Sequence, residues 1–134
     1  MIQESHHGTR PVRKLRLIHS PTPGWETMRR FYRDQLLLEQ TGGWDQENDR
    51  GAFLSLETGE LELMELDAAD IGIVPTAQSP WTIALQVDSA EAECARLRDI
   101  GVPILRAVEA RPWGSQDFLI QDPAGNVLLI FSHN

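Results

Sequence analysis

The feature that most constrains the fold is a hairpin signal near the C-terminus. Two apolar runs, 118–120 and 127–131, flank the sequence Asp122-Pro123-Ala124-Gly125-Asn126. An aspartate at the first turn position can accept a hydrogen bond from a backbone N–H two residues on, and proline presets φ at the second position. Glycine or asparagine then takes a positive φ at low cost. The segment is therefore predicted to be a β-hairpin that closes the domain.

Periodicity and turn residues predict the other elements. In the first half they indicate a strand over 13–19, a helix from Pro23 capped by Thr22, and strands over 52–56 and 61–66. Thr41-Gly42-Gly43 breaks the pattern between the helix and a short segment starting at Trp44. The second half predicts a strand over 82–87, a helix capped by Asp88 or Ser89, and a strand over 103–108 before the hairpin.

The two halves repeat one plan at an offset of 66 residues. Thr22 then matches Asp88 as the helix cap, Gly59 matches Gly125 in a hairpin turn, and Leu17 matches Ile83 in the first strand of each half. Agreement of caps, turns and strand parity predicts a duplicated βαβββ unit.

The length of 134 residues suits one domain with a substantial core. Residues 1–11 are polar and aperiodic, and we expect a flexible arm there. The domain is expected over 12–134, with a first unit at 12–67, a linker at 68–80 and a second unit at 81–134.

Composition argues against several classes of partner. The formal net charge of −8 would repel nucleic acid and anionic membrane surfaces. No apolar run is long enough to span a membrane, and the N-terminus lacks the apolar region of a signal peptide. The single cysteine, Cys94, excludes an intramolecular disulfide and favours a reducing cytoplasm.

The sequence of the last hairpin resembles that of a known family. Trp113-Gly114, a strand, Asp122-Pro123-Ala124-Gly125-Asn126 and a second strand resemble the last hairpin of the glyoxalase/bleomycin-resistance/extradiol-dioxygenase superfamily (vicinal oxygen chelate proteins). The resemblance covers essentially 15–131. It implies an α+β fold in which two βαβββ units form paired half-barrels around a cavity.

That resemblance also tests for a metal site. Metal-dependent members take a His or Gln from the first strand of each unit and a Glu from the last. By resemblance, Thr82 stands at the His position and Leu129 at the Glu position. In the first unit the offset puts Arg16 and Leu63 there, whereas a hairpin shortened by one residue puts Glu62 in place of Leu63. Neither register supplies the several donors that a divalent ion needs, so we expect no metal and no cofactor.

Strand parity predicts which residues line the cavity if Thr82 does. The first and fourth strands would contribute Arg16, Ile18 and Ser20, and Leu61, Leu63 and Glu65, with Arg16 paired to Glu65. The fifth and last strands would contribute Thr82, Ala84 and Gln86, and Val127, Leu129 and Phe131. The seventh strand gives either Asp117, Leu119 and Gln121, which we prefer, or Gln116, Phe118 and Ile120. The candidate ligand-binding residues are Arg16, Glu65, Thr82, Gln86, Trp113, Asp117 and Leu129.

These features favour a small-molecule-binding protein without the family metal, comparable to the bleomycin-resistance members. The acidic balance suits a cationic ligand. The alternative is a metal-dependent lyase, isomerase or dioxygenase whose ligands are displaced to residues such as Glu62, Glu65 and His19; a third class acts only through protein partners. We expect a homodimer, because a curved sheet leaves an apolar edge that a second copy can cover.

Overall fold

The computed structural model describes residues 15–19, 24–47, 49–65 and 82–133. The predicted arm at 1–11 and linker at 68–80 lie outside the described residues. No helix in the described part of the chain is both long enough and apolar enough to cross a membrane.

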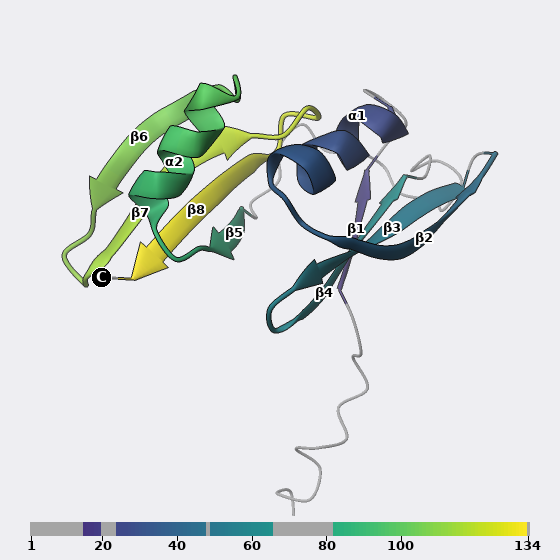
Figure 1. Ribbon diagram of the computed structural model, residues 1–134, viewed down its shortest axis with the longest axis horizontal. Helices are drawn as coiled ribbons and strands as arrows, with labels where there is room; N and C mark the ends of the chain where they lie inside the picture. The colour runs from purple at the N-terminus through teal and green to yellow at the C-terminus, as the bar shows by residue number, and fades with distance from the viewer. Residues whose placement is uncertain (1–14, 20–23, 48, 66–81, 134) are drawn as a thin grey trace, which may run out of the picture.

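Two four-stranded sheets form the framework (Figure 1). The first has the order β1-β4-β3-β2, built from Arg16–His19, Gly59–Glu65, Asp49–Leu56 and Gln40–Gln46. The second has the order β5-β8-β7-β6, built from Ile83–Gln86, Val127–His133, Ser115–Gln121 and Ile104–Ala110. In each sheet the first strand runs parallel to the last, and the other pairs are antiparallel.

Each sheet has a helical segment between its first two strands in the chain. In the first unit this is α1 (Trp25–Arg30), which continues into the π-helical turn η2 (Phe31–Gln35). In the second unit it is α2 (Ala90–Asp99). Identical strand orders and connections confirm the predicted duplication and the α+β class.

The two helices start differently. α2 begins after Ser89, whose hydroxyl accepts a hydrogen bond from the backbone N–H of Ala92 at 3.1 Å, as expected of an N-cap. The buried hydroxyl of Ser132 in β8 accepts a second one from the N–H of Ala90, which ties the helix start to the sheet. α1 begins at Trp25, later than expected, after Gly24, which has no side chain to cap it; Thr22 and Pro23 lie outside the described residues.

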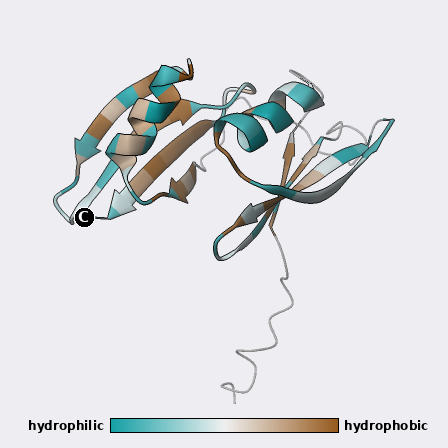
Figure 2. Ribbon diagram, in the orientation of Figure 1, coloured by the Kyte–Doolittle hydropathy of each residue, from teal (hydrophilic) through white to brown (hydrophobic). Residues whose placement is uncertain are grey.

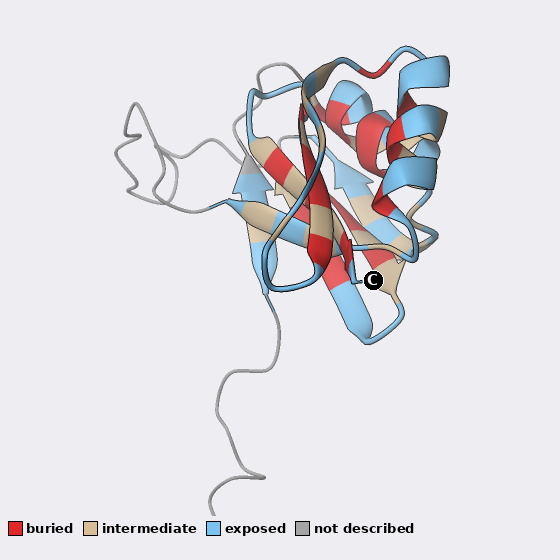
Figure 3. Ribbon diagram, turned by 90° about the vertical axis from the view of Figure 1, so that its left-hand side faces the viewer, coloured by how far each residue is buried: buried red, intermediate tan, exposed pale blue. Residues whose placement is uncertain are grey.

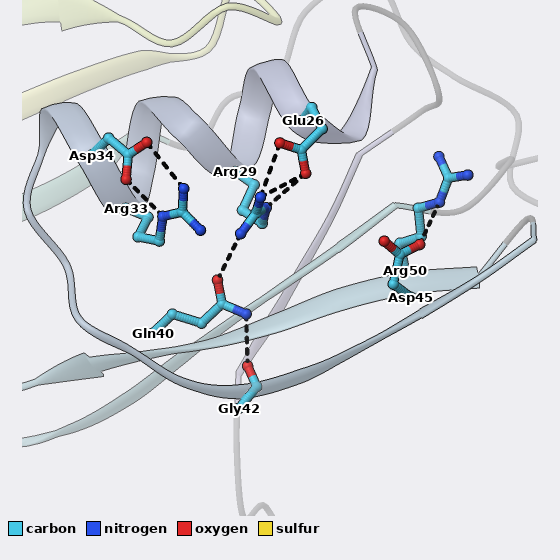
Figure 4. A network of polar contacts seen from close by, with 8 residues as sticks. All are labelled: Glu26, Arg29, Arg33, Asp34, Gln40, Gly42, Asp45 and Arg50. Atoms are coloured by element: carbon cyan, nitrogen blue, oxygen red, sulfur yellow. Dashed lines mark hydrogen bonds and ion pairs between the residues drawn. The ribbon is translucent and has the colours of Figure 1, made fainter.

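Strand β2 runs through the glycines that were expected to break the pattern. It pairs with β3, with a register shift between Gln40 and Gly42. A Cβ atom at Gly43 would lie 2.4 Å from the carbonyl oxygen of Gly51. Glycine therefore permits the close approach of the two strands, and a strand can form where the composition suggested a break. Side chains also link β2 to α1, since Arg29 bonds both Glu26 and Gln40 (Figure 4).

One hydrophobic core spans both units. Buried residues gather where the helices meet the strands (Figure 3), and β8 is hydrophobic along most of its length (Figure 2). In the second unit Cys94 and Leu97 of α2 belong to the same cluster as Phe118, Leu128 and Ile130 of the sheet. In the second sheet the face away from α2 is less buried than the face under the helix.

Candidate functional site

The face of the second sheet away from α2 carries most of the predicted site residues. Ala84 pairs with Leu129 and Gln86 with Phe131, and Phe131 in turn pairs with Asp117. Residues paired across neighbouring strands point to the same side of a sheet. We call this surface the open face; its members are Ala84, Gln86, Asp117, Leu119, Gln121, Val127, Leu129 and Phe131.

Burial supports this assignment. Phe118, Ile120 and Leu128 are fully buried on the α2 side, whereas Leu119, Leu129 and Phe131 are half-buried and Gln86 is exposed. Of the two alternatives for the seventh strand, the structure therefore places Asp117, Leu119 and Gln121 on the open side. Thr82 is exposed and directly precedes β5, in phase with Ala84.

Asp117 is buried and held by two arginines that the sequence analysis did not single out. Arg111 donates to both carboxylate oxygens, at 2.8 Å and 2.7 Å, and Arg106 also bonds Oδ1. The hydrogen bonds from Arg111, followed by those from Arg106, lower the pKa of Asp117 to about 2 against the opposing effect of burial. At neutral pH this carboxylate is a fixed anion that positions two guanidinium groups, so it cannot act as a general acid.

In the first sheet, the expected partner of Arg16 is wrong. Arg16 pairs with Glu62 across β1 and β4 and forms an ion pair with it. The Glu62 side chain is 2% exposed, while that of Arg16 is 44% exposed. The parallel register of β1 and β4 places Glu62 beside Arg16. Glu65 lies three residues further along β4, beside His19.

Glu65 lies on the other side of β4, with Leu61 and Leu63. Those two leucines are buried in the core, so the expectation that all three line the cavity is also wrong. Glu65 is 7% exposed, and one of its oxygens lies 3.9 Å from an Nη atom of Arg50. This side faces the helical layer of the unit, where a ligand on the open side cannot reach it.

The two tryptophans at the strand borders differ in their surroundings. Trp113 is 75% exposed on the turn between β6 and β7. Trp44 lies over Gly51, where a Cβ atom would come within 2.2 Å of the indole ring. Its Nε1–H donates to Asp49 at 2.6 Å, and its ring centroid lies 5.7 Å from that of Phe53. Trp44 is thus fixed within the first sheet, whereas Trp113 is available for stacking.

Comparison with known families agrees with this architecture. The model of the Glyoxalase/Bleomycin resistance protein/Dioxygenase superfamily matches residues 18–130. The chain belongs to this superfamily.

Several solved structures share the fold. One is TnmS3, an antibiotic-binding protein from Streptomyces sp. CB03234, at 20% identity and a TM-score of 0.62, covering 93% of this chain and 100% of that one. Another is lactoylglutathione lyase from Agrobacterium tumefaciens, at 18% identity and a TM-score of 0.62, covering 92% and 95%. A domain from Frankia sp. EAN1pec reaches a TM-score of 0.69 at 15% identity, covering 93% and 98%. A search of curated proteins gave no match.

The strand registers decide which first-unit residue matches Leu129 of the superfamily motif. Leu17 and Ile83 are the helix-facing residues matched by the 66-residue offset. Their partners in the last strands are Leu63 and Leu128. Met64 therefore matches Leu129, one residue after Leu63 and two after Glu62, which were the alternatives left open by the sequence; Arg16 matches Thr82.

The residues at the superfamily's ligand positions do not fit a divalent ion. Arg16 and Leu129 offer no lone pair for a cation, Met64 offers only a soft thioether, and Thr82 offers one hydroxyl. The nearby Glu62 already binds Arg16. A displaced ligand set containing both Glu62 and Glu65 fails as well, because they lie on opposite sides of β4. Among the described residues no group of three or more His, Cys, Asp or Glu side chains could hold a metal.

Proposed function

We propose that this protein binds a small organic molecule without a metal, on the open face of the second sheet. The observation that carries the proposal is the replacement of donor side chains at the superfamily's ligand positions by Arg16, Met64, Thr82 and Leu129. A surface without those donors keeps the shape of the fold but loses the Lewis acid that the metal-dependent chemistry of the superfamily requires.

The composition of the open face supports a mainly apolar ligand with some polar groups. Half-buried Leu119, Leu129 and Phe131 offer apolar contact, and exposed Gln86 offers an amide. Arg106 and Arg111, fixed by Asp117, present guanidinium edges beside them. Small-molecule sites commonly combine such apolar walls with a few positioned polar groups. One structural neighbour is named as an antibiotic-binding protein, which supports this class of function for the fold.

Not all seven ligand-binding candidates from the sequence belong to the proposed surface. Thr82, Gln86, Asp117 and Leu129 belong to the proposed surface, and Trp113 lies on the turn that leads into β7. Arg16 lies on the corresponding side of the first sheet, paired to Glu62. Glu65 is no longer proposed as a ligand contact, because it faces the helical layer. We further infer that the protein acts in the cytoplasm, which the free, buried Cys94 supports.

A ligand screen in the presence of EDTA tests the proposal. Thermal unfolding would be followed with a library of aromatic and aliphatic organic compounds. We expect stabilising compounds whose effect is lost in Leu129→Ser and kept in Leu37→Ser, a matched change at a leucine outside the open face that is 63% exposed. Stabilisation that appears only with added divalent metal, or that both variants reduce equally, would contradict the proposal and favour the metal-dependent enzyme.

A further inference from the structure

A cavity of about 510 Å³ lies between the two units, around the free edge of β5. The turn between β3 and β4 lines one side of it, and β5 with the start of α2 lines the other; the position of these elements in the fold can be followed in Figure 1. Its volume falls within the range of about 300–1,000 Å³ that is typical of small-ligand pockets. Its walls are aliphatic: Leu36, Leu38, Leu56, Leu85, Val87, Leu97 and Ile130.

This cavity lies mainly on the other side of the second sheet from the open face, and the two share only Ala84 and Gln86 of the edge strand. Leu85 and Ile130 are paired neighbours on the α2 side of the second sheet, and Leu97 projects from α2 itself. The cavity reaches the other side of the sheet only around the edge strand, at Ala84 and Gln86. A ligand held here would contact the helical layer of the second unit and the hairpin of the first.

The charged groups of the cavity are all acidic. Glu57, Asp88 and Glu93 line it, and no described residue in its lining is basic. Glu93 is engaged by Arg96 through a hydrogen-bonded ion pair. Glu57 and Asp88 are exposed and make no ion pair with any residue in the described part of the chain. They approach from opposite sides, one from the β3–β4 turn and one from the residue before the N-cap of α2.

From this arrangement we infer that the cavity binds an organic cation with an apolar body. The apolar body would lie against the leucines, where burial of its surface contributes most of the affinity. The cationic group would remain at the mouth between Glu57 and Asp88, attracted by both carboxylates while still partly hydrated. No aromatic side chain lines the cavity among the described residues, so selectivity rests on ion pairing and not on cation–π contacts.

Three small probes of similar shape and different charge test this assignment. They are benzyltrimethylammonium, benzyl alcohol and benzoate, titrated calorimetrically into the full-length protein. We expect the cation to bind about tenfold more tightly than the neutral alcohol, as two exposed ion pairs provide, and benzoate to bind weakest. Raising the salt to about 1 M shortens the screening length to about 3 Å and is expected to remove the difference.

Variants locate the binding. In Glu57→Gln/Asp88→Asn the preference for the cation should disappear while the alcohol binds as before. The control Glu91→Gln/Asp99→Asn removes the same net charge from exposed positions on α2 outside the cavity, and it should retain the preference. Thr58→Trp, on the exposed turn at the cavity, should block the binding of the cation and of the alcohol without unfolding the protein. Its melting temperature checks that it stays folded.

The inference is overturned if no probe binds, if all three bind equally, or if the Glu57/Asp88 variant keeps the preference. Binding that survives Thr58→Trp also overturns it. None of these results bears on the open face, whose ligand depends on Leu129.

Discussion

The phenolic hydroxyl of Tyr32 in η2 donates a 2.7 Å hydrogen bond to Oδ2 of Asp122, the first residue of the β7–β8 turn. The same carboxylate accepts hydrogen bonds from the backbone N–H groups of Ala124 and Asn126 and from the Asn126 side chain. The residue that holds the last hairpin thus also joins the helical segment of the first unit to the second unit. This carboxylate adds a polar link between the two halves to the hydrophobic core that they share.

Removal of the phenolic hydroxyl should weaken that junction. Tyr32→Phe is expected to lower the free energy of unfolding by about 1 kcal/mol, because Asp122 keeps its three other donors. Asp122→Ala should cost more, since the turn N–H groups also lose their acceptor. Urea unfolding measures both. An unchanged unfolding midpoint for Tyr32→Phe at an unchanged m-value would show that the bond contributes nothing.

The same tyrosine should make stability fall in alkaline solution. Burial, and then the neighbouring charge of Asp122, raise the pKa of Tyr32 above its ordinary value. Folding therefore favours the neutral phenol. Its contribution to stability is complete below about pH 10 and is lost as the pH rises further, because the tyrosine ionises first in the unfolded chain. Tyr32 is the only tyrosine of the chain, so tyrosinate absorbance reports it directly. We expect the absorbance to rise only together with unfolding; ionisation of the folded protein near pH 10 would contradict this.

Asp117 should govern stability at the acid end. Its folded pKa of about 2 is below the ordinary value of 3.8, so its ionised form is favoured by folding. The stabilisation is present above about pH 4 and is lost as pH falls towards 2. Asp117→Asn should lower stability at pH 7 by about 2 kcal/mol and flatten the loss between pH 4 and 2. The control, Glu91→Gln at an exposed position on α2, should keep the parent's pH dependence of the free energy of unfolding. The same pH dependence for the parent and Asp117→Asn would refute the assignment.

The edge strand β6 supports a prediction about assembly. Leu105 on this strand is 49% exposed, and Trp113 on the following turn is 75% exposed. We expect a symmetric homodimer that covers this edge. Leu105→Lys should shift sedimentation towards the monomer, whereas Leu37→Lys, at an exposed leucine outside the sheets, should not. A monomeric parent protein at micromolar concentration would rule this assembly out.

The sequence predicted those features that depend on local chemistry. The Asp122-Pro123 turn and the helix-facing Leu17 and Ile83 follow from neighbouring residues and from strand parity. The start of α2 was predicted to within one residue: Ser89 is the cap, and Asp88, which the repeat matched to Thr22, is not. The pairing register of the strands does not follow from neighbouring residues, because it depends on the length of connections elsewhere in the unit. A shift of one residue moves every side chain of a strand to the other face, and this is why Glu65 was expected beside Arg16 in place of Glu62.

The two arginines of the Asp117 cluster were missed for a related reason. Arg106 faces Leu119 across an irregular β6–β7 pairing, with register shifts on both sides of it. Arg111 follows the end of β6, where parity no longer fixes a side chain. A search for basic residues on the strand preceding a buried aspartate would have identified Arg106 as a candidate partner. The strand through Thr41-Gly42-Gly43 was missed because a close approach between backbones leaves no apolar pattern.

Calorimetric titration with Ni²⁺, Zn²⁺ and Mn²⁺ tests whether this member of the superfamily functions without a metal. The protein would be purified without chelators and compared with Thr82→His/Leu129→Glu, which restores two donors to the second unit. We expect no saturable binding to the parent at micromolar concentrations and a gain of affinity in the variant. Binding of one ion per chain to the parent with micromolar or tighter affinity, abolished by Glu62→Gln, would show instead that the protein holds a metal through a displaced ligand set.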